Sequence, residues 1–263
     1  MLEQWQLRPD GPVIIGNGTH VQPVRTSEGT AATLKIGAPD GSEHEHLVLR
    51  RWAGEGAVRL LRADPHQHAL LLERLRPQHL DSLSDYEAAG VIGELYRHIH
   101  VPAMPQLRSL TSLVDHWTTG FSTLPRNAPI PHRLVEQAGA LARDLIADPR
   151  TDAVVLHGNL HPGNVLAADR QPWLAIAPRP INGDPHFEIA PMLWHQWDEL
   201  AGYIRDGVRT RFYTLLDAAG LDEDRARAWV IVRVVHAAMV ELDNGSSPDA
   251  LTKYIALAKA LQD

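Results

Sequence analysis

The sequence contains no cysteine, which excludes disulfide bonds and thiolate metal sites. It also has no run of about 18 apolar residues, so a transmembrane helix is not expected. The N-terminus, Met1 to Trp5, lacks the basic region followed by an apolar region that marks a secretory signal. From these absences we expect a cytoplasmic protein that does not associate with a membrane.

Positive charge is also in short supply, since 25 Lys and Arg face 32 Asp and Glu and the net charge is −7. A general nucleic-acid-binding role is therefore not expected. Hydrophobic residues make up 44% and charged residues 22%, which is ordinary for a globular protein. A chain of 263 residues can bury a substantial core, in one two-lobed unit or in two small domains.

The first part of the chain carries short apolar runs separated by turn signals, a pattern typical of strands. After the third run, residues 42–52 have the period of a helix, with Ser42 as the expected N-cap and Glu45 at capping-box spacing. This predicts the order β-β-β-α-β-β. The predicted strands are residues 13–15, 21–24, 32–36, 57–61 and 69–75.

After residue 81 the chain has apolar residues three and four positions apart, which indicates helices. Two short strands are expected at residues 153–156 and 173–176. We therefore predict a β-rich lobe over residues 1–75 and a mainly helical lobe over residues 76–263. The predicted helices cover residues 84–100, 107–120, 131–147, 188–205, 208–219, 222–242 and 248–262.

The most informative stretch lies between the two short strands. Residues 157–166 read HGNLHPGNVL, and residues 173–179 read WLAIAPR. A kinase catalytic loop places a base Asp five residues before a metal-binding Asn, and a second Asp that binds Mg²⁺ follows shortly after. Here Asn164 keeps the metal-binding position, but the base position holds Asn159 and the second metal position holds Ala177.

This stretch resembles the aminoglycoside and hydroxyurea phosphotransferases, in particular their streptomycin 6-phosphotransferase-like branch. The motifs of that family read roughly HGDLHPGNVL, WLxIDPK and GDPxYDLA, where this chain has HGNLHPGNVL, WLAIAPR and GDPHFEIA. Further matches lie, in the same order, at residues 29–35, 44–61, 70–75 and 227–229. The resemblance implies a two-lobed, protein-kinase-like α+β fold of the aminoglycoside phosphotransferase type.

The resemblance also implies roles for single residues. Lys35 and Glu45 would form the ion pair that holds the α and β phosphates of a nucleotide. Taken alone, they also fit an exposed strand residue and a helix-capping residue. Glu73 to Leu75 would form the hinge, where adenine bonds backbone groups. His157 is expected to be structural, and His161 either structural or in contact with a phosphate or the acceptor.

Four departures from the family cluster in this site. Asn159 replaces the base, and loss of a general base alone costs about 10²- to 10⁴-fold in rate. Ala177 replaces the metal carboxylate, and Mg²⁺ requires oxygen ligands. Arg179 replaces the family Lys, and Phe187-Glu188 replaces Tyr-Asp.

Only one ligand of the metal motif is then left, the neutral amide of Asn164. Asp184 and Glu188 are the nearest carboxylates in sequence that could substitute for the lost one. Asp184, however, matches the Asp of the family's own GDP motif, and Glu188 would require the loop to be rebuilt.

We therefore expect a degenerate phosphotransferase, or pseudokinase, that acts by binding a small molecule, a peptide or a protein partner. ATP or ADP would bind weakly or not at all, with a weak or absent contribution from Mg²⁺. One alternative is an active ATP-dependent small-molecule phosphotransferase with a rearranged site, in antibiotic resistance or natural-product metabolism. Another is non-kinase chemistry in the same cleft, such as nucleotidyl transfer or elimination.

Overall fold

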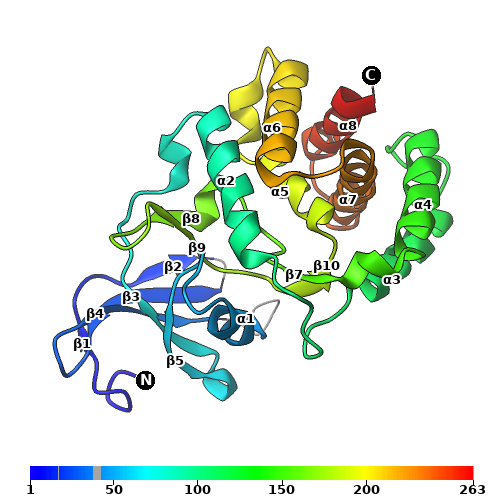
Figure 1. The fold of residues 1–263 in the computed structure, drawn as a ribbon. Coiled ribbons are helices and arrows are strands. Elements are labelled where there is room, and N and C mark those ends of the chain that lie inside the picture. The colour runs from blue at the N-terminus through cyan, green and yellow to red at the C-terminus, as the bar shows by residue number, and fades with distance from the viewer. Residues whose placement is uncertain (17, 38–42, 263) are drawn as a thin grey trace.

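The computed structural model describes residues 1–16, 18–37 and 43–262. Its N-terminal part is an antiparallel sheet with one helix, and the rest of the chain is mainly helical. In Figure 1 the strands lie at the bottom and the helices of the second lobe above them. The predicted two-lobed α+β architecture is therefore confirmed, while the division at residue 75 stays a prediction.

The sheet contains six strands in the order β1-β3-β4-β6-β5, with β2 also paired to β3. Ala32 and Leu34 of β4 are buried in one cluster with Trp5 and Leu7 of the N-terminal segment. Because side chains alternate along a strand, Lys35 points to the opposite face. The strands are β1 Arg8–Pro9, β2 Ile14–Gly16, β3 Thr19–Arg25, β4 Ala31–Ile36, β5 Leu60–Asp64 and β6 Ala69–Glu73.

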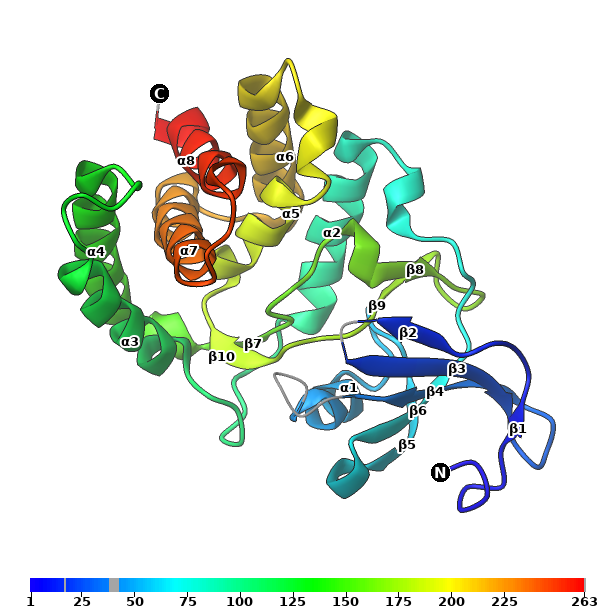
Figure 2. The same cartoon turned by 180° about the vertical axis from the view of Figure 1, so that it is seen from behind.

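Helix α1, Glu45–Trp52, lies beside the sheet on the side of the second lobe (Figure 2). It begins later than the predicted start at Ser42, which lies outside the described residues. The capping box predicted with Ser42 likewise lies outside the described residues. Both carboxylate oxygens of Glu45 accept hydrogen bonds from Lys35, so an ion pair joins the start of α1 to the sheet.

Strand β5 begins later than the predicted strand at residues 57–61. Ala57 and Val58 are buried where the two lobes meet, and Ala57 forms a parallel bridge with Ala175. The Val58 N–H donates to the Ala175 carbonyl at 2.9 Å, and the Ala175 N–H donates to the Gly56 carbonyl at 3.0 Å. The first part of the predicted strand, residues 57–58, therefore joins the lobes, and the strand of the sheet begins at Leu60.

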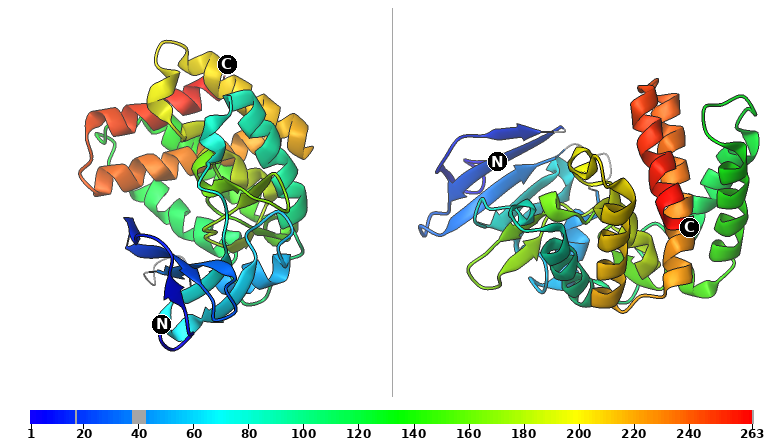
Figure 3. Two further views of the ribbon diagram at one scale, coloured as in Figure 1. Left: turned by 90° about the vertical axis from the view of Figure 1, so that its left-hand side faces the viewer. Right: turned by 90° about the horizontal axis from the view of Figure 1, so that it is seen from above.

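The helices of the second lobe are close to those predicted, apart from one. Helix α2 starts with a capping box, in which Ser84 and Glu87 each accept a hydrogen bond from the backbone of the other. Helix α2 packs along α6, and α7 packs between α4 and α8 (Figure 3). No described helix is long and apolar enough to cross a membrane. These helices are α2 Asp85–Ile99, α3 Leu110–Thr123, α4 His132–Ile146, α6 Ile204–Ala219, α7 Glu223–Asp243 and α8 Pro248–Gln262.

The single helix predicted over residues 188–205 is wrong. Gln196 has a φ of 46° and ends the first helical part. Arg211 of α6 is buried and donates to the His195 carbonyl at 2.6 Å, so a guanidinium group, not another turn, satisfies this helix end. The segment instead contains a 3-10 helix at Pro185–Ile189, the short helix α5 at Ala190–Trp194 and a 3-10 helix at Trp197–Leu200.

Two short antiparallel strand pairs position the motif residues. Strand β7, Val154–Leu156, pairs with β10, Ile181–Gly183, and strand β8, Val165–Ala167, pairs with β9, Trp173–Ala175. Strands β8 and β10 were not among the predicted ones. Between the two strand pairs, the Arg179 N–H donates to the His157 carbonyl at 2.8 Å. The loop at residues 157–164 and the segment at residues 176–180 therefore lie side by side.

Candidate functional site

Lys35 and Glu45 form a close ion pair between β4 and α1. The Lys35 ammonium donates to both carboxylate oxygens of Glu45, at 2.8 and 2.6 Å. The Glu45 side chain is 1% exposed and that of Lys35 is 13% exposed. Burial raises the pKa of Glu45, and the attraction of Lys35 opposes that rise. The pair expected from the motif is thus assembled, and the alternative of an exposed lysine beside a helix cap is not what the chain adopts.

The loop at residues 157–164 is anchored by His157. Its Nε2 lies 3.0 Å from the Ile176 carbonyl, and the Asn159 N–H donates to its Nδ1 at 3.3 Å. Burial lowers the pKa of His157 to about 3, so the ring is neutral at physiological pH. A neutral ring with Nε2 protonated satisfies both contacts. His157 therefore ties the loop to the segment that follows β9.

Asn159 and Asn164 face each other across the turn of the loop. The Asn164 side-chain amide donates to the Asn159 backbone carbonyl at 2.9 Å. The same amide nitrogen lies 3.2 Å from Nε2 of His161. The Asn164 amide nitrogen thus holds the loop closed, and its side-chain oxygen is the group that remains to meet a ligand.

Ala177 follows β9 with a φ of 54°, in the left-handed region. For an L-residue with a Cβ this conformation costs roughly 1 to 2 kcal/mol, and Asn and Asp are the residues that visit it most readily after glycine. The backbone at this position therefore suits the carboxylate that the family motif carries better than it suits alanine. The methyl group itself offers no atom that could bind a metal ion.

The side chains around Asn164 do not fit Mg²⁺. This ion requires oxygen ligands and in phosphate sites usually takes one or two carboxylates. The motif supplies one amide oxygen, from Asn164, and nothing from Ala177. No group of three or more His, Cys, Asp or Glu side chains within residues 1–16, 18–37 and 43–262 could hold a metal ion.

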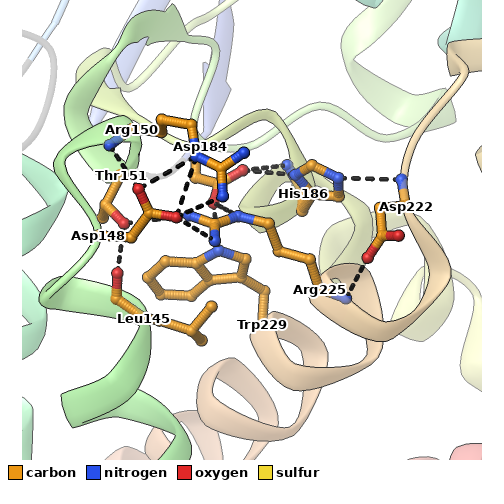
Figure 4. A network of polar contacts seen from close by, with 9 residues as sticks. All are labelled: Leu145, Asp148, Arg150, Thr151, Asp184, His186, Asp222, Arg225 and Trp229. Carbon is orange, nitrogen blue, oxygen red and sulfur yellow. Dashed lines mark hydrogen bonds and ion pairs between the residues drawn. The ribbon is translucent and has the colours of Figure 1, made fainter.

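Asp184, one of the two carboxylates that could substitute, is buried in a polar network (Figure 4). Its Oδ1 accepts from the His186 N–H at 3.0 Å and lies 2.6 Å from His186 Nδ1. Its Oδ2 accepts from Trp229 Nε1 at 2.7 Å and from Arg225 Nε at 2.5 Å. Four contacts occupy the lone pairs of this carboxylate. Asp184 therefore fastens α7 to the segment that follows β10 and has no free oxygen for a metal ion.

Glu188, the other carboxylate, holds the loop from behind. It is fully buried, and its Oε1 accepts from the Gly158 N–H at 2.5 Å. Arg233 of α7 donates to the Gly158 carbonyl and to the Phe187 carbonyl, both at 2.7 Å. A Cβ on Gly158 would lie 2.1 Å from the Arg179 carbonyl oxygen, so only glycine fits between these contacts. The N–H of Gly158 is thus held by a carboxylate, and its carbonyl is held by a guanidinium group.

Burial raises the pKa of Glu188 to about 7, although the Gly158 N–H and Arg233 act in the opposite direction. Because this pKa is raised from 4.5, the folded state binds more protons than the unfolded state between these values, and the contribution of Glu188 to stability falls as pH rises. Glu188→Gln keeps an oxygen for Gly158 and does not titrate. As pH rises from 5 to 8, the free energy of unfolding of the variant should therefore increase by roughly 2 kcal/mol relative to that of the wild type.

Urea unfolding at a series of pH values measures this difference. Glu94→Gln, on the exposed face of α2, is a matched control and should run parallel to the wild type. Parallel curves for wild type and Glu188→Gln would show that Glu188 does not titrate in this range.

His161 packs against the segment that follows α5. Its ring stacks on His195 with centroids 4.5 Å apart, and His195 Nε2 lies 2.7 Å from Asp81 Oδ1. Burial, aided by His195, lowers the pKa of His161 to about 4. Its Nδ1 is buried without a hydrogen-bond partner among the described residues. A neutral ring of such low pKa is a poor general base at neutral pH, so it does not make up for Asn159.

The side chain of Glu73, at the expected hinge, is engaged within the protein. It accepts from the Arg59 N–H at 2.7 Å and from Arg170 Nη2 at 2.6 Å. Burial favours a higher pKa for Glu73, but Arg170 and the Arg59 N–H outweigh it and the pKa is lowered. Arg170 also donates to the Gly54 carbonyl at 2.6 Å. Leu75 is half-buried against the core.

A cavity of about 560 Å³ opens beside the loop. It lies between the N-terminal end of α1, helices α3 and α7, and the segment after β9. A volume of this size is typical of small-molecule sites. Its lining includes Arg108, Trp117, Gly158, Arg179, Phe187, Trp194 and Arg233.

The chain matches the model of the aminoglycoside/hydroxyurea antibiotic resistance kinase family over residues 4–245. The chain belongs to this family. Streptomycin 6-kinase of Streptomyces glaucescens is 38% identical, with 100% of this chain and 87% of the relative covered. Hydroxyurea phosphotransferase of Kitasatospora aureofaciens is 39% identical, with 93% of this chain and 72% of the relative covered.

Solved structures confirm the kinase-like fold of this family member. A thermostable mutant of an aminoglycoside phosphotransferase, crystallised with ADP and hygromycin B, superposes with a TM-score of 0.66 over 99% of this chain and 96% of that one, at 14% identity. A choline/ethanolamine kinase family protein from Mesorhizobium loti gives a TM-score of 0.65 over 96% and 88% of the two chains, at 16% identity. The predicted aminoglycoside phosphotransferase type of fold is therefore confirmed.

Sequence reasoning missed several residues of the site in this family member. Arg233 lies in the middle of α7, and Arg108 and Trp117 lie before and within α3. None of them belongs to a motif, and an isolated arginine on a helix carries no local signal of a site. The motif identifies Arg179 as a departure from the family Lys, but it does not indicate that Arg179 lines the cavity.

Proposed function

We propose that this chain is a catalytically degenerate member of the family, which binds a small molecule in the cleft between its lobes and does not transfer phosphate. The observation that carries the proposal is the joint absence of a carboxylate at Asn159 and at Ala177. Asp184 uses both oxygens within the protein. Glu188 is fully buried with its Oε1 on the Gly158 N–H, and its Oε2, which has no partner among the described residues, could reach a metal ion only if the loop were rebuilt.

The size of the combined loss supports this proposal. Removal of a general base costs about 10²- to 10⁴-fold, because proton transfer from the acceptor is no longer assisted. Phosphoryl transfer otherwise depends on positioning and on the charge of the metal ions. A site without the second metal carboxylate loses that contribution as well, and the two losses together leave little catalysis.

Nucleotide binding is a separate matter from catalysis. The Lys35–Glu45 pair is intact and buried, so a group that can meet phosphates persists. ADP and an ATP analogue are present in the solved complexes of the aminoglycoside phosphotransferase. We propose that this chain binds ATP or ADP weakly and with little dependence on Mg²⁺. A peptide or a protein partner remains the other occupant of the cleft that the sequence allows.

A second candidate is an active small-molecule kinase with a rearranged site. Identity of 38 to 39% to two kinases over most of the chain favours it, because such identity usually accompanies a shared activity. It requires an acid that the described contacts do not offer. A cytoplasmic location and a role in natural-product metabolism remain predictions from the sequence.

The purified protein, supplied with Mg²⁺-ATP and either streptomycin or hydroxyurea, should release no ADP above the background of a reaction without acceptor. A streptomycin 6-kinase assayed in parallel is the positive control. Metal-dependent turnover of either acceptor would overturn the proposal and establish the rearranged-site kinase.

A further inference from the structure

The cavity beside the loop carries a charge opposite to that of the whole protein. Three guanidinium groups line it, from Arg108, Arg179 and Arg233, against one carboxylate, Glu43. The chain as a whole has a net charge of −7. Positive charge gathered in a concave site of an acidic protein attracts anions, because the field is concentrated in the hollow.

Two of these arginines are free to meet a ligand. The side chains of Arg108 and Arg179 are exposed and make no hydrogen bond or ion pair with the part of the chain that the structure describes. Their backbones, in contrast, are fixed: the Arg108 carbonyl accepts from Asn182 N–H at 2.8 Å, and the Arg179 N–H donates to the His157 carbonyl at 2.8 Å. Each guanidinium group is therefore carried by a backbone segment that hydrogen bonds hold in place.

The remaining wall is aromatic. Trp194 is half-buried in this wall. Trp117 and Phe187, only 8% and 3% exposed, have ring centroids 6.1 Å apart, and Trp117 stacks on His236 with centroids 3.8 Å apart. The Arg233 guanidinium lies 4.1 Å above the Phe187 ring. Burial lowers the pKa of His236 to about 4, so this ring adds apolar surface and no charge. Such a wall favours a flat apolar group.

We propose that this cavity binds a planar aromatic anion, with an oxyanion group held by Arg108 and Arg179 and its ring against the half-buried Trp194. Planar guanidinium groups match carboxylate and phosphate oxygens in pairs, which makes arginine suited to either group. Amino sugars such as aminoglycosides are polycationic at neutral pH and would meet three like charges. The inference rests on the proposed function, since it specifies the small molecule that the cleft binds.

Binding of 2-naphthoate, 2-naphthyl phosphate and 2-(aminomethyl)naphthalene, measured by calorimetry, tests the proposal. The three probes share a ring system and differ in the charged group. We expect at least one of the two anions to bind about tenfold tighter than the amine, and added salt to weaken that binding. The tighter of the two anions identifies the oxyanion.

Arg108→Gln and Arg179→Gln should each weaken the preferred anion by about tenfold, the loss expected for one charge-assisted contact. Arg126→Gln, an exposed arginine in the connection between α3 and α4, is the matched control and should bind as the wild type does. Equal or tighter binding of the amine, no binding of either anion at about 5 mM, or unchanged affinity in both cavity variants would overturn the proposal.

These outcomes are independent of the activity assay, because no nucleotide is present. Turnover of streptomycin with Mg²⁺-ATP would end the proposed function whatever the naphthalene probes do. Failure of the anions to bind in a protein that also shows no turnover would end only the inference about the ligand.

Discussion

Ala177→Asp alone should restore most of the Mg²⁺-dependent nucleotide affinity, and Asn159→Asp alone should restore little. The wild type is expected to bind ATP weakly and almost equally with and without Mg²⁺. The new carboxylate at position 177 supplies the missing charge next to Asn164, while Lys35 and Glu45 are already paired. A base at position 159 has nothing to act on unless the γ-phosphate is fixed. Calorimetry should show Mg²⁺ tightening ATP binding to Ala177→Asp by about 10- to 100-fold.

Ala177→Asn is the matched control for this change. Asn and Asp both tolerate the left-handed conformation seen at this position, so both should relieve the strain of alanine to a similar degree. Only Asp adds charge, so only Asp should couple ATP binding to Mg²⁺. If Asn159→Asp alone produced the coupling, the roles given to the two positions would be exchanged. If the double variant Asn159→Asp, Ala177→Asp bound no ATP, the cleft would have been refitted for another ligand.

The fold was predictable because local and long-range signals agree along most of the chain. Helix α2 has a capping box at Ser84 and Glu87 as well as a helical period, and its predicted bounds differ from the observed ones by one residue at each end. The signals conflict over residues 188–205, where Pro191 and Gln196 break the helical period. There the decisive contact is Arg211, which lies beyond the segment and gave no local sign of its role.

The strand predicted at residues 57–61 shows the same limit. An apolar run fits a sheet strand and a buried connection equally well, and only the pairing of Ala57 with Ala175 decides between them. The outcome thus depends on a contact between residues more than a hundred positions apart in the sequence. Periodicity within the run holds no information about it.

For the site, the motifs identified the loop but not what surrounds it. The contact between Lys35 and Glu45 followed from the family resemblance, because both residues belong to motifs. The engagement of Asp184 by Arg225 and Trp229, and that of Glu188 with Gly158 beside Arg233, depends on the packing of α7 against the 3-10 helix Pro185–Ile189. Sequence proximity suggested these acids as substitute ligands. Tertiary contacts occupy both oxygens of Asp184 and bury Glu188 behind the loop, with its Oε1 on Gly158.

Acid should unfold this protein at a pH where most of its carboxylates are still ionised. Burial lowers the pKa of His100 and His157 to about 3, and of His161 and His236 to about 4. The unfolded chain binds protons at these positions near 6.5, so between about pH 4 and 6.5 it holds more protons than the folded chain. Stability is therefore lost as pH falls below 6.5. His100 and His157 should each cost about 2 kcal/mol at pH 5.

The raised pKa of Glu188 stabilises the folded state as pH falls, and this gain offsets about as much free energy as one of the four histidines costs. The remaining loss of several kcal/mol is large beside a typical folding free energy of about 5 to 15 kcal/mol. Urea unfolding followed by circular dichroism at pH 7.5, 6.5, 5.5 and 5.0 should therefore show a midpoint that falls steeply over the last three points.

His100→Phe is the sharpest variant for this effect. The ring of His100 stacks on Tyr96 at 4.8 Å, and its buried Nε2 has no hydrogen-bond partner among the described residues, so phenylalanine replaces it without losing a contact of that nitrogen. The variant should be about 2 kcal/mol more stable than the wild type at pH 5, with a smaller difference at pH 7.5. His98→Gln, an exposed histidine of the same helix, should leave the pH dependence unchanged. Wild-type and His100→Phe curves that fall in parallel would mean that His100 is protonated in the folded state, and the acid lability would have to arise elsewhere.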